Sequence, residues 1–163
     1  MTGDSIEQRL QCLVDDLEIR RVMQDYAAAV DARDWTVLRT VLADDLVVDY
    51  HNGRTIVRGG DAVVTYIREN TAHLAWQHHN VSTYRVDVDG DTATGLTYLI
   101  SHQQIAEDLS HLLMMVARYD CQFRRRDDRW QLSRMAHTIQ ANNFVPHQSA
   151  PPSDLDIPPA VRP

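Results

Sequence analysis

An aspartate that ends an amphipathic helix and a histidine pair on a later strand are the residues of this chain best suited to proton transfer. Apolar residues recur at three- and four-residue spacings over residues 19–30, which is typical of a helix with one buried face. Asp31 follows at the edge of that face, where an ionised carboxylate needs a charged or hydrogen-bonding partner. We predict that a histidine from a strand, His78 of the run Gln77-His78-His79, is this partner.

A carboxylate and an imidazole in contact can act together as a general base. A neutral imidazole accepts a proton from a carbon next to a carbonyl when it lies within about 2.6–3.2 Å of that proton's position. The carboxylate holds the other ring nitrogen in the correct tautomer and stabilises the imidazolium that forms. An Asp31–His78 pair would therefore suit reactions that begin with removal of a proton from carbon.

Each of these side chains also has a structural explanation. Asp31 could satisfy backbone groups at the end of its helix, as short polar side chains commonly do. His78 and His79 could be a half-exposed strand pair, and His102 could satisfy a hydrogen bond in the core. Tyr50 could pack against the sheet without touching a substrate. The residues alone leave both explanations open.

The histidines do not have the spacing of a metal site. Zinc and iron sites take three or so ligands, commonly with short spacings such as two histidines four apart on a helix. His78 and His79 are adjacent, so on a strand they point to opposite faces, and no carboxylate follows at a ligand spacing. The sequence also contains no glycine-rich phosphate loop and no nucleophile elbow. We therefore predict chemistry without a metal or a cofactor.

Composition and charge favour one ordinary globular domain. The 163 residues are 44% hydrophobic and 24% charged, and the net charge of −7 argues against a nucleic-acid surface. The N-terminus is polar and no apolar run approaches the roughly 20 residues of a membrane helix, so we expect a cytoplasmic protein with no membrane partner. Cys12 and Cys121 are expected to be buried free thiols.

The order of periodic segments predicts an α+β fold. Helical spacing and capping residues predict a lead-in over residues 1–14 and helices over residues 15–30, 35–42 and 62–69. Alternation and turn signals predict strands over residues 46–50, 55–58, 77–86, 92–104, 113–125 and 129–143. We expect a cone-shaped, curved antiparallel sheet closed by the N-terminal helices within residues 1–145. The proline-rich residues 146–163 are expected to form an extended or disordered tail.

Alternation along the strands sorts the candidate pocket residues by face. His78 and Asn80 share one face of their strand, and Tyr98 and His102 share one face of the next. A face that mixes tyrosine, isoleucine and histidine suits a pocket wall better than open solvent. The candidate substrate-binding residues are Tyr26, Trp76, Asn80, Tyr98 and Tyr119. Apolar residues assigned to the outer face favour a homo-oligomer; they include Val81, Leu99 and Met115.

Four short motifs resemble the SnoaL-like branch of the nuclear transport factor two-like superfamily. They are Val-Asp-Ala-Arg-Asp-Trp at residues 30–35, Gln-His-His-Asn at 77–80, Asp-Gly-Asp-Thr-Ala at 89–93 and Arg-Arg-Asp-Asp-Arg-Trp at 125–130. Within that branch the chain is most similar to the scytalone dehydratases and the hexachlorocyclohexane dehydrochlorinases, over about residues 15–145. The resemblance implies a cystatin-like α+β barrel and a homotrimer or homodimer.

The resemblance also implies a role for individual residues. Asp31 would orient His78, and His78 would be the base that removes a proton from the substrate. His102 would assist the leaving group, and Tyr50 would polarise a carbonyl. These roles match the general-base chemistry that an aspartate–histidine pair can perform.

The function implied is a cofactor-independent lyase, with dehydration as the first choice, or an isomerase. The substrate would be an apolar cyclic molecule such as a polyketide, a steroid or an aromatic-like compound. Val30, Ala117 and Tyr119 depart from the pocket residues of scytalone dehydratase, so the substrate is expected to differ. The alternatives are polyketide cyclisation and a non-catalytic ligand-binding or subunit domain, like the small subunit of ring-hydroxylating dioxygenases. The non-catalytic alternative predicts no Asp–His hydrogen bond and a filled cone.

Overall fold

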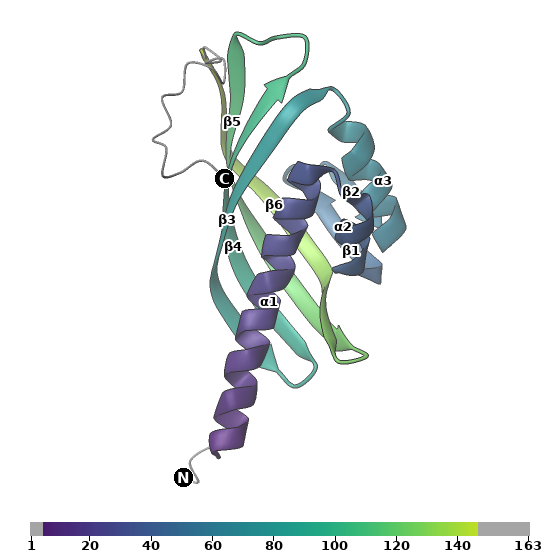
Figure 1. Cartoon of the computed structure of the whole chain (residues 1–163), viewed down its shortest axis with the longest axis vertical. Helices are drawn as coiled ribbons and strands as arrows, with labels where there is room; N and C mark the ends of the chain where they lie inside the picture. The colour runs from purple at the N-terminus through teal and green to yellow at the C-terminus, as the bar shows by residue number, and fades with distance from the viewer. Residues whose placement is uncertain (1–4, 147–163) are drawn as a thin grey trace, which may run out of the picture.

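A long capped helix and a run of alternating strands build a curved sheet with helices on its inner face (Figure 1). The computed structural model describes residues 5–146. The elements in that range are α1 (Ile6–Ala32), α2 (Trp35–Thr40), β1 (Leu42–Tyr50), β2 (Thr55–Arg58), α3 (Gly60–Asn70), β3 (Leu74–Asp89), β4 (Thr92–Ile105), β5 (His111–Arg126) and β6 (Arg129–Pro146). The predicted tail falls outside the described residues except for Pro146.

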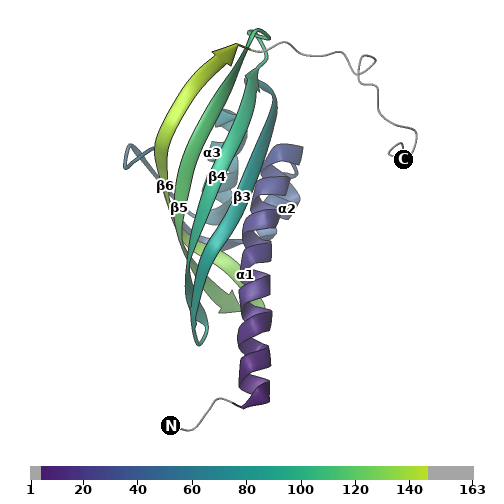
Figure 2. The same cartoon turned by 90° about the vertical axis from the view of Figure 1, so that its left-hand side faces the viewer.

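The strands form one curved sheet in the order β2-β1-β6-β5-β4-β3 (Figure 2). Neighbouring strands are antiparallel except for β1 and β6, which run parallel with Val48 opposite Met135. The predicted α+β class, with N-terminal helices against a curved sheet, is confirmed. The sheet is mixed rather than wholly antiparallel, and β2 and β3 remain as edges, so hydrogen bonds do not close the cone.

Strand β3 changes the facing of its side chains twice. Its register against β4 shifts between Leu74 and Trp76 and again between Thr83 and Arg85. Such irregularities insert one residue and reverse the alternation beyond them. Between the two shifts the odd-numbered residues face the helices, whereas outside them even-numbered residues such as Leu74 and Val86 do so. A single alternation therefore cannot describe the whole strand.

Helix α1 is one continuous element where the sequence predicts a lead-in and a separate helix. Ser5 is its N-cap, because its side chain accepts from the Gln8 N–H and the Gln8 side chain accepts from the Ser5 N–H. Asp15 and Glu18, the predicted capping box, therefore lie in the helix interior. The prediction is wrong because a capping signature and an interior aspartate with a distant partner have the same local sequence.

Asp15 joins α1 to the β5–β6 hairpin. It is 3% exposed, and it accepts from Arg125 Nη1 and Nη2 at 2.9 and 3.0 Å and from Trp130 Nε1 at 3.1 Å. Burial alone would raise the pKa of Asp15, but the hydrogen bonds from Trp130 and Arg125 outweigh burial and lower it. The ionised form is therefore the one that holds the helix to the hairpin.

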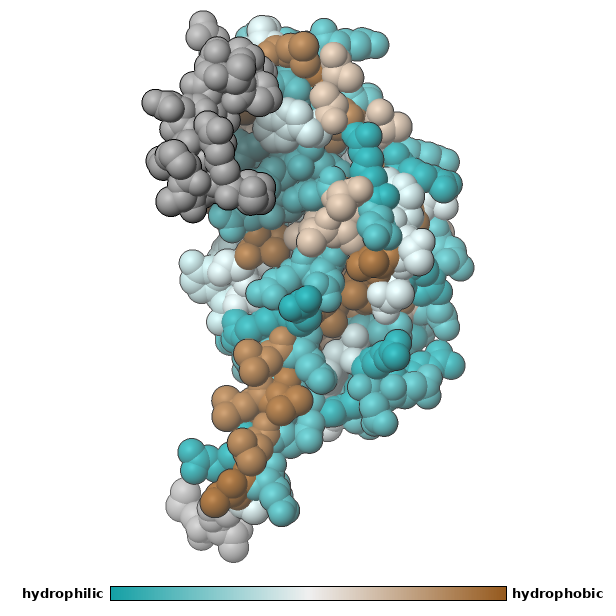
Figure 3. All heavy atoms as spheres, in the orientation of Figure 1, coloured by the Kyte–Doolittle hydropathy of each residue, from teal (hydrophilic) through white to brown (hydrophobic). Residues whose placement is uncertain are grey.

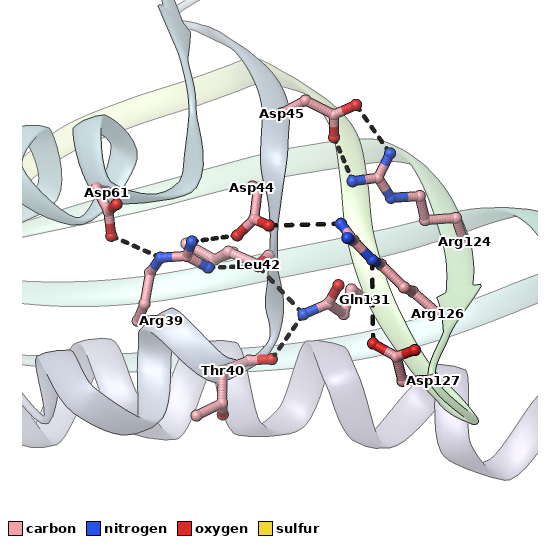
Figure 4. A network of polar contacts seen from close by, with 10 residues as sticks. All are labelled: Arg39, Thr40, Leu42, Asp44, Asp45, Asp61, Arg124, Arg126, Asp127 and Gln131. Carbon is pink, nitrogen blue, oxygen red and sulfur yellow. Dashed lines mark hydrogen bonds and ion pairs between the residues drawn. The ribbon is translucent and has the colours of Figure 1, made fainter.

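A second polar network lies on the surface beside the β5–β6 turn (Figure 4). Arg39 of α2 pairs with Asp44 and Asp61 and donates to the Leu42 carbonyl. Asp44 also forms an ion pair with Arg126. The network connects α2, the start of β1, the start of α3 and the end of β5. Its carboxylates are largely exposed, so each pair contributes little to stability.

The two cysteines lie in different environments. Cys121 on β5 is buried, and burial raises the pKa of its thiol. Cys12 is exposed, so the expectation of a buried thiol is wrong there. The reason is that the first turns of α1 extend beyond the sheet (Figure 1). Within residues 5–146, no helix has both the length and the apolar character needed to span a bilayer.

Candidate active site

A cavity of about 260 Å³ lies between the helices and the inner face of the sheet. Its walls are mostly aromatic and apolar. The residues used below are Tyr26 and Val30 of α1, Tyr50 and His51 at the end of β1, Tyr66 of α3, His79 of β3, Tyr119 of β5 and His137 of β6. No arginine of the described residues lines it, and the chain has no lysine. The cavity thus offers no fixed positive charge to a ligand.

The end of α1 is anchored so that Asp31 faces β3. Arg33, in the left-handed region with φ 57°, ends the helix and returns its N–H to the Ala29 and Val30 carbonyls. The buried Gln77 side chain of β3 donates to the Val30 carbonyl at 2.7 Å. These contacts hold the last turn of the helix against the strand and place Asp31 beside it.

Asp31 binds His79 through both of its carboxylate oxygens. Oδ1 contacts His79 Nδ1, and Oδ2 accepts from the His79 backbone N–H at 2.8 Å. The His79 side chain is 10% exposed and lines the cavity, whereas Asp31 lies behind it and borders a separate outer hollow. Since the carboxylate accepts a hydrogen bond at Nδ1, Nε2 is the nitrogen left to act as a base.

His78 lies on the opposite face of β3 from the cavity. Its side chain is 66% exposed, and its Nδ1 is 4.0 Å from Asp31 Oδ2. The predicted Asp31–His78 pair is therefore corrected to Asp31–His79. Alternation places His78 and His79 on opposite faces but does not say which face is the inner one, and the register shifts of β3 make that choice.

The other predicted site residues divide between the two faces of the sheet. Three of them, Tyr26, Tyr50 and Tyr119, line the cavity. Four others do not: Trp76, Asn80 and Tyr98 are exposed, and His102 shares the face of Tyr98 and lies opposite His78. The structure therefore does not bring His102 to the cavity. The same reversal of β3 that exposes His78 accounts for Asn80 and, through the β3–β4 pairing, for Tyr98 and His102.

Three of the four cavity tyrosines, Tyr26, Tyr50 and Tyr119, are held in their neutral forms. Burial raises the pKa of Tyr26 to about 12 and raises the pKa values of Tyr50 and Tyr119 well above their usual range. Tyr50 stacks on Tyr66 at 4.7 Å between ring centroids. Its buried hydroxyl makes no hydrogen bond within the described residues. It is therefore a donor available to a ligand.

His137 is a cavity residue that the sequence analysis missed. It is 7% exposed, and neither ring nitrogen has a hydrogen-bond partner within residues 5–146. Burial lowers its pKa to about 4, with a smaller contribution from the positive charges that His51 and His79 can carry. Its ring lies edge-on to Tyr119 at 5.1 Å between centroids. The buried Met135 two residues earlier is the sequence signal that could have placed His137 on the inner face.

The arrangement separates a base from neutral hydrogen-bond donors. His79, oriented by Asp31, stands at one part of the wall, and the unpartnered polar atoms of Tyr50 and His137 stand at another. Within residues 5–146 no group of three or more His, Cys, Asp or Glu side chains could hold a metal ion. The walls can accept a proton and can donate hydrogen bonds to a developing oxyanion.

Comparison with known proteins gives relatives of the same fold. An uncharacterized protein of Mycobacterium tuberculosis, Rv2910c, is 27% identical over 124 residues, which cover 76% of this chain and 84% of that protein. The crystal structure of a type 2 hexachlorocyclohexane dehydrochlorinase (LinA) has a TM-score of 0.78 at 20% identity, covering 88% of this chain and 98% of that one. A candidate scytalone dehydratase from Novosphingobium aromaticivorans has a TM-score of 0.74 at 17% identity, covering 85% and 92%.

At this low identity, the similar structures show a shared fold and nothing more. Sequence comparison with protein families assigns the chain to a family directly. Residues 11–136 match the SnoaL-like domain. The matched region contains α1 from its second turn onward, every other helix, and the sheet up to the middle of β6. It therefore includes Asp31, His79 and the tyrosines of the cavity. The chain belongs to the SnoaL-like domain family.

Proposed function

We propose that this protein is a cofactor-independent lyase or isomerase that removes a proton from a carbon of a neutral, mostly apolar cyclic substrate. The observation that carries the proposal is the Asp31–His79 pair, in which the imidazole lines the cavity and the carboxylate lies behind it. A hydrogen bond of this kind and an unfilled cavity favour an enzyme over the non-catalytic alternative. Dehydration is the first choice of reaction.

His79 is the base in this proposal, and Asp31 is its positioning residue. Nε2 takes the proton from a carbon next to the substrate carbonyl, while Asp31 keeps Nδ1 protonated and stabilises the imidazolium. Tyr50 donates a hydrogen bond to the carbonyl oxygen as negative charge develops there. In a dehydration the electron pair of the broken C–H bond forms the carbon–carbon double bond as the C–O bond breaks, and the proton held on His79 Nε2 passes to the departing hydroxide to give water and the neutral base.

The cavity limits the class of substrate. About 260 Å³ of largely apolar space suits a small ring system. An anionic substrate would find no arginine on the walls within the described residues, so a neutral molecule fits better. The names of two similar structures, a dehydrochlorinase and a candidate scytalone dehydratase, both denote eliminations, and this supports the same reaction class here. His102 lies on the outer face, so a residue of the cavity must assist the leaving group instead.

A panel of neutral cyclic β-hydroxy ketones tests the proposal, since loss of water gives enones that absorb in the ultraviolet. We expect turnover of at least one member, and we expect Asp31→Asn to lower kcat by at least about 10²-fold, the lower bound for positioned proton transfer. Retention of near-full kcat by Asp31→Asn would exclude the dyad. Exchange of substrate α-protons in D₂O without enone formation would instead favour the isomerase or the polyketide-cyclase alternative, since both use proton abstraction without a leaving group.

We expect His137 to donate a hydrogen bond to the substrate as a neutral imidazole and to make stability depend on pH. Its pKa of about 4 in the folded protein lies below the usual 6.5, so the unfolded chain binds more protons between these values. The free energy of unfolding should therefore decrease as pH falls from 6.5, and the decrease should reach about 3 kcal/mol once pH is below 4. His137→Phe, which keeps an aromatic ring beside Tyr119, should flatten that slope in urea unfolding and lower kcat/KM. An unchanged slope would contradict the assignment.

A further inference from the structure

An apolar stripe runs along the N-terminal part of α1 and is exposed to solvent (Figure 3). It consists of Ile6, Leu10, Leu13, Val14 and Leu17, whose exposed fractions lie between 45% and 75%. Asp15 of the same helix is buried against the β5–β6 hairpin, and the apolar residues of α1 are buried from Ile19 onward. Solvent-exposed apolar patches of this extent usually mark an interaction surface.

The stripe has the spacing of a coiled-coil seam rather than that of a helix packing on a sheet. Ile6, Leu10, Leu13 and Leu17 are separated by four, three and four residues, the alternation of the d and a positions of a heptad. The next seam position is Arg20, which pairs with Asp16 and donates to a backbone carbonyl of β3 in the same chain. The seam therefore ends at Arg20, because the side chain at this position is used by contacts within its own chain.

We propose that this stripe pairs with the same stripe of a second copy of the chain, as an antiparallel two-helix interface. In that arrangement Leu10 packs against Leu13 of the second copy, and Ile6 packs against Leu17 of the second copy. By two-fold symmetry each contact occurs twice, so all four seam positions are used and the surface is self-complementary. Val14 flanks the seam and adds to the buried apolar area.

Charge and shape favour the antiparallel orientation. At the positions beside the seam, Arg9 comes opposite Asp16 of the second copy, and the symmetric contact pairs the same charges again. The antiparallel pair also places the two folded bodies at opposite ends of the helices. A parallel pair would bring both bodies to the same end, immediately after Leu17, where each sheet already occupies the side of the helix (Figure 1).

The size of the surface sets the expected affinity. Residues Ile6–Leu17 span about 18 Å of helix, which gives an interface at the small end of the roughly 1,200–2,000 Å² range of specific association. We therefore expect a reversible, concentration-dependent dimer. This surface differs from the one predicted on the outer sheet face, because Leu99 and Met115 in fact lie buried on the inner face.

Sedimentation velocity over a range of concentrations tests the pairing. The unaltered chain should pass from monomer to dimer as concentration rises, and Leu10→Asp combined with Leu13→Asp should remain monomeric throughout with an unchanged circular-dichroism spectrum. Ile56→Asp, which alters an exposed apolar residue on β2, is the matched control and should dimerise normally. A chain that is monomeric at every concentration, or a dimer that survives the double substitution, would overturn the proposal.

A spin label distinguishes the two orientations. Arg21→Cys is introduced with Cys12→Ser, and Cys121 is buried and so remains unlabelled. In the antiparallel pair the two labels lie about 28 Å apart along the helix axis, because about 19 residues at roughly 1.5 Å separate their levels. In a parallel pair they lie side by side, at about 10 Å, the spacing of packed helices. The shorter distance would overturn the antiparallel arrangement.

Discussion

His79→Ala should abolish turnover, with kcat about 10²–10⁴-fold lower, whereas His78→Ala should leave kcat within about twofold of the unaltered enzyme. The two histidines are adjacent in sequence and lie on opposite faces of β3, so each serves as the control for the other. Only His79 lines the cavity and binds Asp31 through its ring, while His78 is largely exposed to solvent. The comparison therefore tests the facing of the strand as well as the identity of the base.

Enone formation under single-turnover conditions, with thermal unfolding of each variant, provides the measurement. Asp31 retains the His79 backbone N–H as a partner after His79→Ala, so the unfolding midpoint should change little. His79→Gln supplies a side-chain donor without a base and should restore any lost stability but not kcat. Loss of activity in the His78 variant with retention in the His79 variant would exclude the proposed base.

Asp15→Asn should destabilise the fold by about 3 kcal/mol at pH 7, the low end of the cost of breaking a buried ion pair. The low end applies because Arg125 keeps 20% of its side chain exposed and so stays partly hydrated. For a chain of this length the midpoint of thermal unfolding should fall by about 6–12 °C. Differential scanning calorimetry measures the change, and a fall of less than about 2 °C would mean that the contacts of Asp15 with Arg125 and Trp130 do not stabilise the helix.

The pH dependence of the unfolding free energy and a surface variant as a control strengthen the test of Asp15. Because the pKa of Asp15 is lowered by folding, its stabilisation is present above the unfolded value near 3.9 and is lost as pH falls through the lower folded value. The difference between Asp15→Asn and the unaltered chain should therefore shrink only in strong acid. Asp61→Asn removes an exposed carboxylate of the Arg39 network (Figure 4) and should cost less than about 1 kcal/mol.

Local sequence signals were enough to predict the class of fold and several of its helix caps and turns. A helix was expected from residue 35, and Asp34 directly before it is the N-cap, whose carboxylate accepts from the Val37 N–H at 3.0 Å. Strands were expected over residues 46–50 and 55–58, and the Asn-Gly turn within residues 51–54 joins them as the antiparallel pair β1–β2. These features depend on neighbours within four residues, so the sequence contains the information directly.

Features that depend on distant partners could not be predicted in the same way. Nothing local indicates that β1 runs parallel to β6, or that Asp15 meets Trp130 more than a hundred residues later. The choice of His78 over His79 failed for a related reason. The register shifts that set the facing of β3 arise from its pairing with β4, and the sequence of β3 alone does not reveal them.

The two register shifts in β3 separate the segment Trp76–Thr83 from the rest of its strand. An insertion or deletion of one residue at either shift could be absorbed there, while the pairing of Arg85–Asp89 with β4 stays in place. Such a change would turn the solvent-facing side chains of this segment toward the helices and the helix-facing side chains toward solvent. His78 would then take the place of His79 in the cavity wall. Over evolutionary time a small insertion could therefore redesign one wall of the cavity in a single step, with the scaffold left intact.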